Sequence, residues 1–177
     1  MKQRIFLITG LVAVALVASA VAVAGTISPT AVVSGTAGVS LSLPSNPSIS
    51  DTLDGTDQTV SYAPDLGLVD ARGTGAGWNL QISATNFSDG AGHTLAPGTV
   101  SAVSAACHAG STCSAATSSG ITYPLNVTAT AAKFFNAASN TGLGKIDVTP
   151  TVQVAIPGNA YAGTYTSTVT LAAATGP

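Results

Sequence analysis

The sequence predicts an all-β fold, a single antiparallel β-sandwich of the Greek-key or immunoglobulin-like kind that follows an N-terminal signal helix. Two observations indicate it: short segments alternate strictly between apolar and polar residues, and Gly, Pro, Asn and Asp separate these segments. A third is that no helical period of apolar residues follows the N-terminal 24 residues. At 177 residues the chain is long enough for one domain with a sizeable core.

The clearest predicted strand covers residues 78–85, directly after three glycines that allow positive φ. Trp78, Leu80, Ile82 and Ala84 would point to one side, and the polar residues between them to the other. Trp78 is the only tryptophan of the chain. It is either the central core residue or an exposed ring that stacks on carbohydrate, and its place in the alternation favours the core.

The N-terminus is typical of a secretory signal peptide. A basic start with Lys2 and Arg4 precedes an uncharged apolar run, and small residues before Gly25 suit cleavage. Because the run is long, a retained membrane anchor is the alternative. We therefore divide the chain into a signal peptide (1–24), a lead-in segment (25–35) and a β-sandwich domain (36–177).

The other elements follow from alternation and turn residues. We expect strands near 36–43, 60–63, 66–71, 99–105, 121–128, 146–156 and 165–171, and a short element at 133–135. Pro124 and Pro150 indicate edge positions or bulges, since proline cannot donate to a ladder. Residues 87–98 and 111–120 are expected to be loops, and His93 in the first of them is expected to be solvated.

Charge excludes some classes of partner. Without Lys2 and Arg4, three basic residues remain against seven acidic ones, a formal charge of −4. Such a chain is not expected to bind nucleic acid or anionic lipid, so contact with a membrane is expected only through the signal segment. The surface must consist of Ser, Thr, Asn and Gly, which suits an extracellular protein that rests on glycan or on other subunits.

Cys107 and Cys113 are the only cysteines, and the signal peptide places them in an oxidising compartment. We predict that they form a disulfide, worth roughly 2 kcal/mol in the chain-entropy model. A metal site at these cysteines and His108 would lack a fourth ligand. The aspartates around Gly55 fit an Asx turn better than a calcium loop. We expect no metal, no cofactor and no enzymatic activity, because no catalytic motif is present.

Two segments resemble the signatures of the WxL-domain family of bacterial surface proteins. Asp70-Ala71-Arg72-Gly73 and then Gly77-Trp78-Asn79-Leu80 are similar to the first. The second, Tyr-x-x-x-Leu-Thr-Trp-x-Leu-x-x-x-Pro, matches the chain end without a gap and keeps Tyr165, Thr170 and Pro177. Val169, Leu171 and Ala173 replace the Leu, Trp and Leu of that signature.

The resemblance implies a secreted, non-catalytic protein of the cell surface that attaches noncovalently to the cell wall, with peptidoglycan as ligand. Trp78, Leu80, Tyr165 and Leu171 would be its binding residues. We further expect Tyr165, Val169 and Leu171 to pack on the same core as Trp78. The alternative is a structural subunit of a surface layer, filament or matrix that associates with itself or with other surface proteins, since an uncharged edge strand is not protected against pairing.

Overall fold

The computed structural model describes residues 28–177, so the predicted signal peptide lies outside the described residues. Residues 33–177 form one compact unit. Its secondary structure consists of β-strands, and every strand pair is antiparallel. The antiparallel β-sandwich predicted from the alternation is confirmed.

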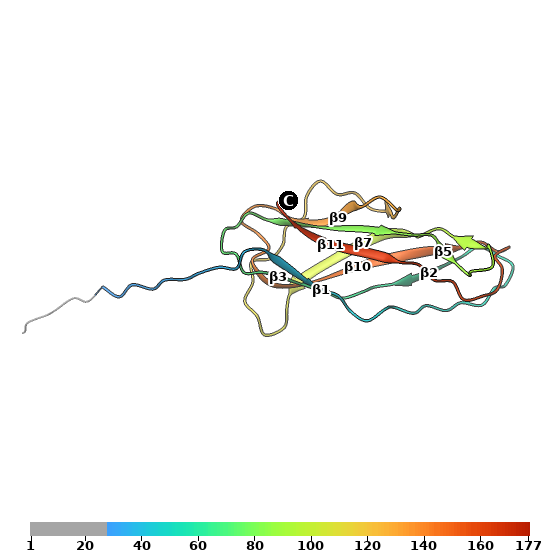
Figure 1. The fold of residues 1–177 in the computed structure, drawn as a ribbon, viewed down its shortest axis with the longest axis horizontal. Helices are drawn as coiled ribbons and strands as arrows, with labels where there is room; N and C mark the ends of the chain where they lie inside the picture. The colour runs from blue at the N-terminus through green and yellow to red at the C-terminus, as the bar shows by residue number, and fades with distance from the viewer. Residues whose placement is uncertain (1–27) are drawn as a thin grey trace, which may run out of the picture. The chain divides into compact units, whose positions relative to one another are not determined.

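The larger sheet has the strand order β1-β3-β10-β7-β8, and β2 also pairs with β10. Its strands are β1 (Val39–Ser42), β2 (Gln58–Tyr62), β3 (Leu66–Asp70), β7 (Thr99–Cys107), β8 (Leu125–Asn126) and β10 (Gly144–Ile156). The smaller sheet has the order β11-β4-β9, from β4 (Trp78–Ala84), β9 (Ala132–Ala137) and β11 (Val169–Thr175). A hairpin of β5 (Phe87–Ser88) and β6 (Thr94–Leu95) lies at the end of the sandwich away from the C-terminus (Figure 1).

Strand β10 is the centre of the larger sheet. Its even-numbered residues from Ile146 to Val154 are buried, as the alternation predicts, and its odd-numbered residues are more exposed. β7 pairs with one edge of β10, while β3 and β2 follow each other along the other edge. Figure 1 shows β7 and β10 side by side.

Two prolines explain why β2 and β3 are separate strands. Tyr62 pairs with Val152 and Leu66 pairs with Val148, so Pro64 lies opposite Pro150. Neither proline has an N–H, so this rung of the ladder cannot form a backbone hydrogen bond. Pro150 therefore does not break β10 or place it at an edge. It interrupts the neighbouring strand, and the predicted bulge is found next to it, because the register with β7 shifts between Thr151 and Val152.

The core lies between the two sheets. Its fully buried large side chains come from β3, β4, β7, β9 and β10 and include Trp78, Phe134, Leu66, Leu68, Leu80, Val100 and Val148. Burying an aliphatic or aromatic side chain of this size contributes about 1.5–3 kcal/mol. The interpretation of Trp78 as a core residue is confirmed.

Most predicted strands differ from the observed ones by one to three residues at an end, and two differ by more. The alternation of residues 121–128 is visible in their burial, but only Leu125–Asn126 pair with β7, so most of this segment packs on the core without joining the ladder. The last strand starts at Val169 rather than at Tyr165 and continues to Thr175, because its register follows β4. Among residues 28–177, no helix is long and apolar enough to cross a membrane.

Candidate functional site

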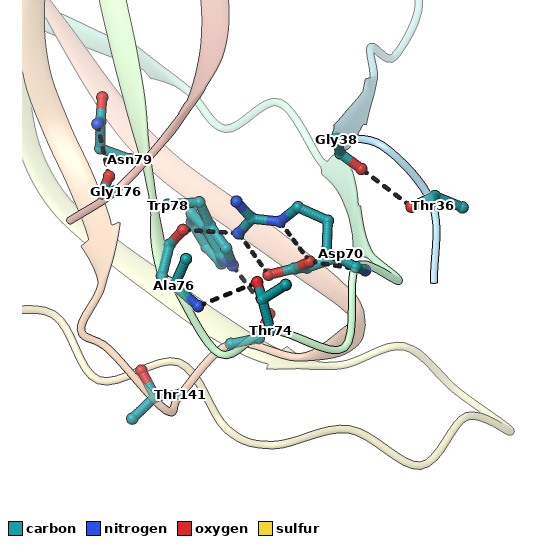
Figure 2. Close-up of polar contacts among 12 residues, drawn as sticks. Thr36, Gly38, Asp70, Thr74, Ala76, Trp78, Asn79, Thr141 and Gly176 are labelled. Carbon is teal, nitrogen blue, oxygen red and sulfur yellow. Dashed lines mark hydrogen bonds and ion pairs between the residues drawn. The ribbon is translucent and has the colours of Figure 1, made fainter. Parts of the chain in front are cut away.

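The first signature segment is held by a buried ion pair. Arg72 donates from Nε to Asp70 Oδ1 and from Nη2 to Asp70 Oδ2, both at 2.8 Å (Figure 2). Their side chains are 6% and 0% exposed. These hydrogen bonds lower the pKa of Asp70 below its usual value against the opposing effect of burial. Arg72 Nη2 also donates to the carbonyl of Gly77 at 2.7 Å, so the pair fixes both ends of the loop that leads into β4.

The glycines of that loop are needed at two positions. Gly77 has φ 71°, and a Cβ there would come within 2.4 Å of the carbonyl oxygen of Ala137. Gly75 has φ 65°, and a Cβ there would lie 2.8 Å from Oδ1 of Asn140. Side chains rarely adopt this backbone region, and space is also limited, by backbone at Gly77 and by the side chain of Asn140 at Gly75. The glycine spacing of the signature is therefore a packing requirement of the loop.

Trp78 is fully buried, and its indole N–H is satisfied. Nε1 donates to the carbonyl oxygen of Gly142 at 2.8 Å, and the indole lies in a tilted contact with Phe135, with 5.9 Å between ring centroids. A Cβ on Gly142 would come within 2.6 Å of Nε1, so the indole can approach this backbone only because residue 142 has no side chain. A buried N–H without a partner is costly, and this carbonyl removes that cost.

The structure places the two signature segments next to each other. β11 pairs with β4 so that Leu171 lies opposite Ile82, Ala173 opposite Leu80 and Thr175 opposite Trp78. Asn79 Nδ2 donates to the carbonyl of Gly176 at 2.8 Å and ties the chain end to β4 (Figure 2). Segments almost a hundred residues apart in sequence thus form one two-stranded unit.

The four predicted binding residues do not form one exposed cluster. Trp78 and Leu80 are fully buried, while Leu171 is partly buried and packs against the core. Tyr165 precedes β11, at the other end of β4 from Trp78, and donates from its hydroxyl to the carbonyl of Tyr161 at 3.0 Å. The role of these residues in binding remains a prediction.

The expected common packing of the last strand is partly wrong. Leu171 contacts the core, but Val169 is 37% exposed. Tyr165 is partly buried outside the core cluster, because the chain before Val169 pairs with the β5–β6 hairpin instead of continuing along β4. The two hydrogen bonds between Ser88 and Thr166 make this connection.

His93 lies in the turn between β5 and β6, as expected, but its side chain is only 37% exposed and has partners in the fold, so the expectation that it is solvated is correct only in part. Its Nδ1 lies within hydrogen-bond distance of Oδ2 of Asp89, and its ring stacks on that of Tyr161 with 3.9 Å between centroids. The hydrogen bond with His93 is the main cause that lowers the pKa of Asp89. The four-residue spacing of Asp89 and His93 was the available signal, whereas Tyr161 is too distant in sequence to be connected to them.

Cys107 and Cys113 form the predicted disulfide at the end of β7. His108 within that loop contacts Asp147 at 2.9 Å, a half-exposed surface pair. Asp54 Oδ1 accepts the backbone N–H of Thr56 at 2.9 Å, as the predicted Asx turn requires. Over residues 28–177, no group of three or more His, Cys, Asp or Glu side chains is arranged to hold a metal ion.

An open groove of about 420 Å³ lies beside the C-terminal end of β4. It is lined by alanine, threonine, asparagine, proline and valine side chains: Ala84, Thr85, Asn86, Pro97, Val127, Thr128 and Ala129. None of these side chains titrates near neutral pH, and general acid–base or nucleophilic chemistry needs such groups. The groove offers shape and neutral polar contacts, which suit binding.

The fold and these sites define a disulfide-bonded β-sandwich module built around a buried Trp and an Asp–Arg pair. Comparison with protein families places it more narrowly: the model of the WxL domain, a surface cell wall-binding domain, matches residues 33–176. The chain belongs to this family, and the resemblance seen in its two signature segments is confirmed. No curated protein matches the chain. A binding domain of the cell surface, as the family describes, agrees with the predicted non-catalytic role.

Proposed function

We propose that this chain is exported and attaches noncovalently to the cell wall, with peptidoglycan as its ligand. Membership of a family of wall-binding surface domains over residues 33–176 is the observation that carries the proposal. The neutral groove and the low charge support it, because binding would depend on shape and hydrogen bonds rather than on charge. The buried Trp78 would act indirectly, by holding β4 and β11 in the geometry that shapes the outer surface.

A pull-down of the mature chain on purified wall sacculi tests this function. We expect the folded chain to sediment with sacculi. A heat-unfolded sample is the control that shows whether binding needs the folded surface. Muramidase digestion of the sacculi should release the chain if the glycan is the ligand. Retention in the supernatant at micromolar concentrations would contradict wall attachment.

Leu171 allows a sharper test, because the family signature has Trp at this place. Leu171 lies opposite Ile82 and packs against the core. Leu171→Trp would therefore add an aromatic ring next to the core while the same side of β11 stays buried. Strong sedimentation of the unmodified chain would show that the second Trp is dispensable. Sedimentation only of Leu171→Trp would show that this chain has lost wall binding by that substitution.

The second candidate function is a structural subunit that associates through β11. In the described part of the chain, β11 pairs with β4 alone and is the outer strand of its sheet. It carries no charged residue and starts with the exposed Val169. Uncharged edge strands readily pair with another chain.

Val169→Lys tests assembly through this edge. A lysine at an edge opposes strand pairing and, at an exposed position, should change the free energy of unfolding by less than about 0.5 kcal/mol. If β11 mediates assembly, size-exclusion chromatography should show oligomers of the unmodified chain that disappear in the variant. Ile49→Lys, at an exposed position outside the strands, is the control. Monomers at all concentrations would contradict the structural-subunit function.

A further inference from the structure

Tyr161 presents one face of its ring to solvent. The residue is 64% exposed, which is high for a tyrosine, and it is one of few large apolar side chains this exposed in the described part of the chain. The imidazole of His93 covers the other face, at 3.9 Å between centroids and 17° between planes. The exposed area therefore belongs to the free face and the edges of the phenol ring.

The His93 ring is held in place from its own hairpin. Asp89 binds it through Oδ2 at Nδ1, and Oδ1 of the same carboxylate accepts the backbone N–H groups of Ala91 and His93 at 2.8 and 3.0 Å. A carboxylate with these three donors has little freedom to rotate. The imidazole beneath Tyr161 is thus a fixed support rather than a mobile side chain.

The backbone of Tyr161 is also fixed, by contacts on both sides. The hydroxyl of Tyr165 donates to the carbonyl of Tyr161 at 3.0 Å. Before Tyr161, a turn closes with the N–H of Ala160 on the carbonyl of Pro157 at 2.9 Å, and Gly158 N–H donates to Oδ1 of Asp57 at 2.9 Å. Rigid aromatic side chains lose little entropy when they bind a partner, so this ring is prepared for binding.

The charges near this ring exclude one class of wall polymer. Asp89 lies beneath it and Asp57 anchors its turn, so the local charge is negative. The three cations of the described chain lie elsewhere: Arg72 in its buried pair, Lys133 on β9 and Lys145 at the start of β10. A phosphate-rich polymer would be repelled here, whereas an uncharged sugar would not.

We propose that the free face of Tyr161, supported by His93, is a stacking platform for an uncharged pyranose ring of the wall glycan. The C–H groups on one side of such a ring carry partial positive charge, which complements the negative face of the phenol. This inference rests on the proposed wall attachment and assigns it a site. It moves the stacking role that the sequence allowed for Trp78 to a residue that is exposed.

Binding of Tyr161→Ala, Tyr161→Phe and His93→Ala to wall sacculi tests the platform. Removal of the ring should weaken binding by at least about tenfold, as is typical of an aromatic anchor, and Phe should restore it to within about twofold because the stacking face remains. The affinity of His93→Ala for sacculi should lie between those of Tyr161→Ala and Tyr161→Phe, since this variant removes only the support of the ring. Leu43→Ala, which shortens a 55% exposed side chain that has no part in the contact between His93 and Tyr161, is the matched control. Far-UV circular dichroism and melting curves check that each variant is folded.

The outcomes separate the platform from wall attachment itself. If the unmodified chain and Tyr161→Ala sediment equally with sacculi, the platform is wrong and wall attachment stands. If the unmodified chain does not sediment, the platform is judged with a soluble β-1,4-linked N-acetylglucosamine tetrasaccharide at about 10 mM, which detects millimolar affinity by amide NMR. Shifts around Tyr161 and His93 that vanish in Tyr161→Ala support it, and their absence overturns it. Tighter binding of soluble polyglycerol phosphate than of the tetrasaccharide would overturn the assignment to an uncharged sugar.

Discussion

At the scale of single residues, the structure depends on a few large side chains that donate hydrogen bonds to the carbonyl groups of glycines. The indole of Trp78 rests against Gly142, and the guanidinium of Arg72 reaches the carbonyl of Gly77. In both places a large side chain satisfies its polar group on a glycine carbonyl, where no neighbouring Cβ blocks the approach. Large and small residues are therefore coupled in pairs that sequence spacing does not reveal.

Trp78→Ala should lower the free energy of unfolding by about 3–5 kcal/mol, because it removes the largest core side chain and leaves a cavity. Urea unfolding followed by circular dichroism measures the change. Tyr161→Ala, at an exposed ring, is the contrasting variant and should change stability little. A Trp78→Ala variant of unchanged stability would contradict the core role of the indole.

Gly142→Ala isolates the contact with the indole. Its φ of 72° disfavours alanine by about 1–2 kcal/mol, and its Cβ would lie 2.5 Å from Cβ of Ala137 and 2.6 Å from Nε1 of Trp78. Gly120 has the same φ, and a Cβ there would have no atom within 4 Å. Gly120→Ala therefore loses only the stability that positive φ costs an alanine. We expect Gly142→Ala to be the more destabilising by about 1–3 kcal/mol in urea melts. Equal losses of stability in the two variants would show that the residues around the indole move to make room for the added methyl group.

At the scale of elements, adjacency in the sheets explains the family signatures. β4 and β11 pair along their whole length, so each signature provides one strand of the same unit. The replacement of Trp by Leu171 is compatible with this pairing, since an inward strand position accepts either apolar side chain. Leucine buries less apolar area, which at about 25 cal/mol per Å² changes stability by a small amount compared with the loss of Trp78.

The disulfide belongs to a local element, and its loss should have a local effect. Cys107 ends β7 and Cys113 lies beside Gly144, so the bond closes a short loop at the end of the larger sheet. The double variant Cys107→Ser, Cys113→Ser should lose at most about 2 kcal/mol. Hydrogen exchange should increase in residues 108–113 and remain unchanged in β4. Non-reducing mass spectrometry of secreted protein should find both thiols blocked, and thiols that alkylate readily would contradict the bond.

At the scale of the whole molecule, stability should fall in acid. Asp70 has a lowered pKa through its hydrogen bonds with Arg72, and Asp89 through its contact with His93. A carboxyl whose pKa is lower in the folded state stabilises the fold when it is ionised. This stabilisation is complete above the pKa of the unfolded chain, about 3.9, and is lost as the pH falls through the pKa of the folded state. Melting temperatures measured from pH 7 to pH 2 should therefore decrease mainly below about pH 4. Asp70→Asn should be less stable at pH 7 and show a flatter decrease, and a parallel decrease would contradict this assignment.

The low charge of the whole chain predicts weak salt dependence of wall binding. With three cations and seven aspartates in residues 25–177, and the Arg72–Asp70 pair buried, few charges remain to attract a polymer. Sedimentation with sacculi should change by less than about twofold between low and high salt, since screening acts on exposed charges. Loss of binding at high salt would instead indicate an anionic wall polymer as the ligand.

Local patterns in the sequence were enough to predict the fold class, most of the strands and the core role of Trp78, but not the β5–β6 hairpin, which lies in the expected loop of residues 87–98. Alternation with a period of two reports which face of a strand is buried. The bond between Cys107 and Cys113 was predicted because the signal peptide implies an oxidising compartment and the chain has no other cysteine. The family resemblance was likewise legible in adjacent residues. Each of these signals is read without knowing which segments are neighbours in the fold.

Only the tertiary structure decided which distant segments meet. It placed Pro64 opposite Pro150, turned the chain at Tyr165 away from β4, and brought Tyr161 onto His93 across almost seventy residues of sequence. The physical reason is that strand pairing depends on the register of the whole sheet and on loop closure, and alternation within one strand carries no information about its partner. The buried strands were therefore predictable, whereas the exposed ring pair that we propose as the glycan platform was not.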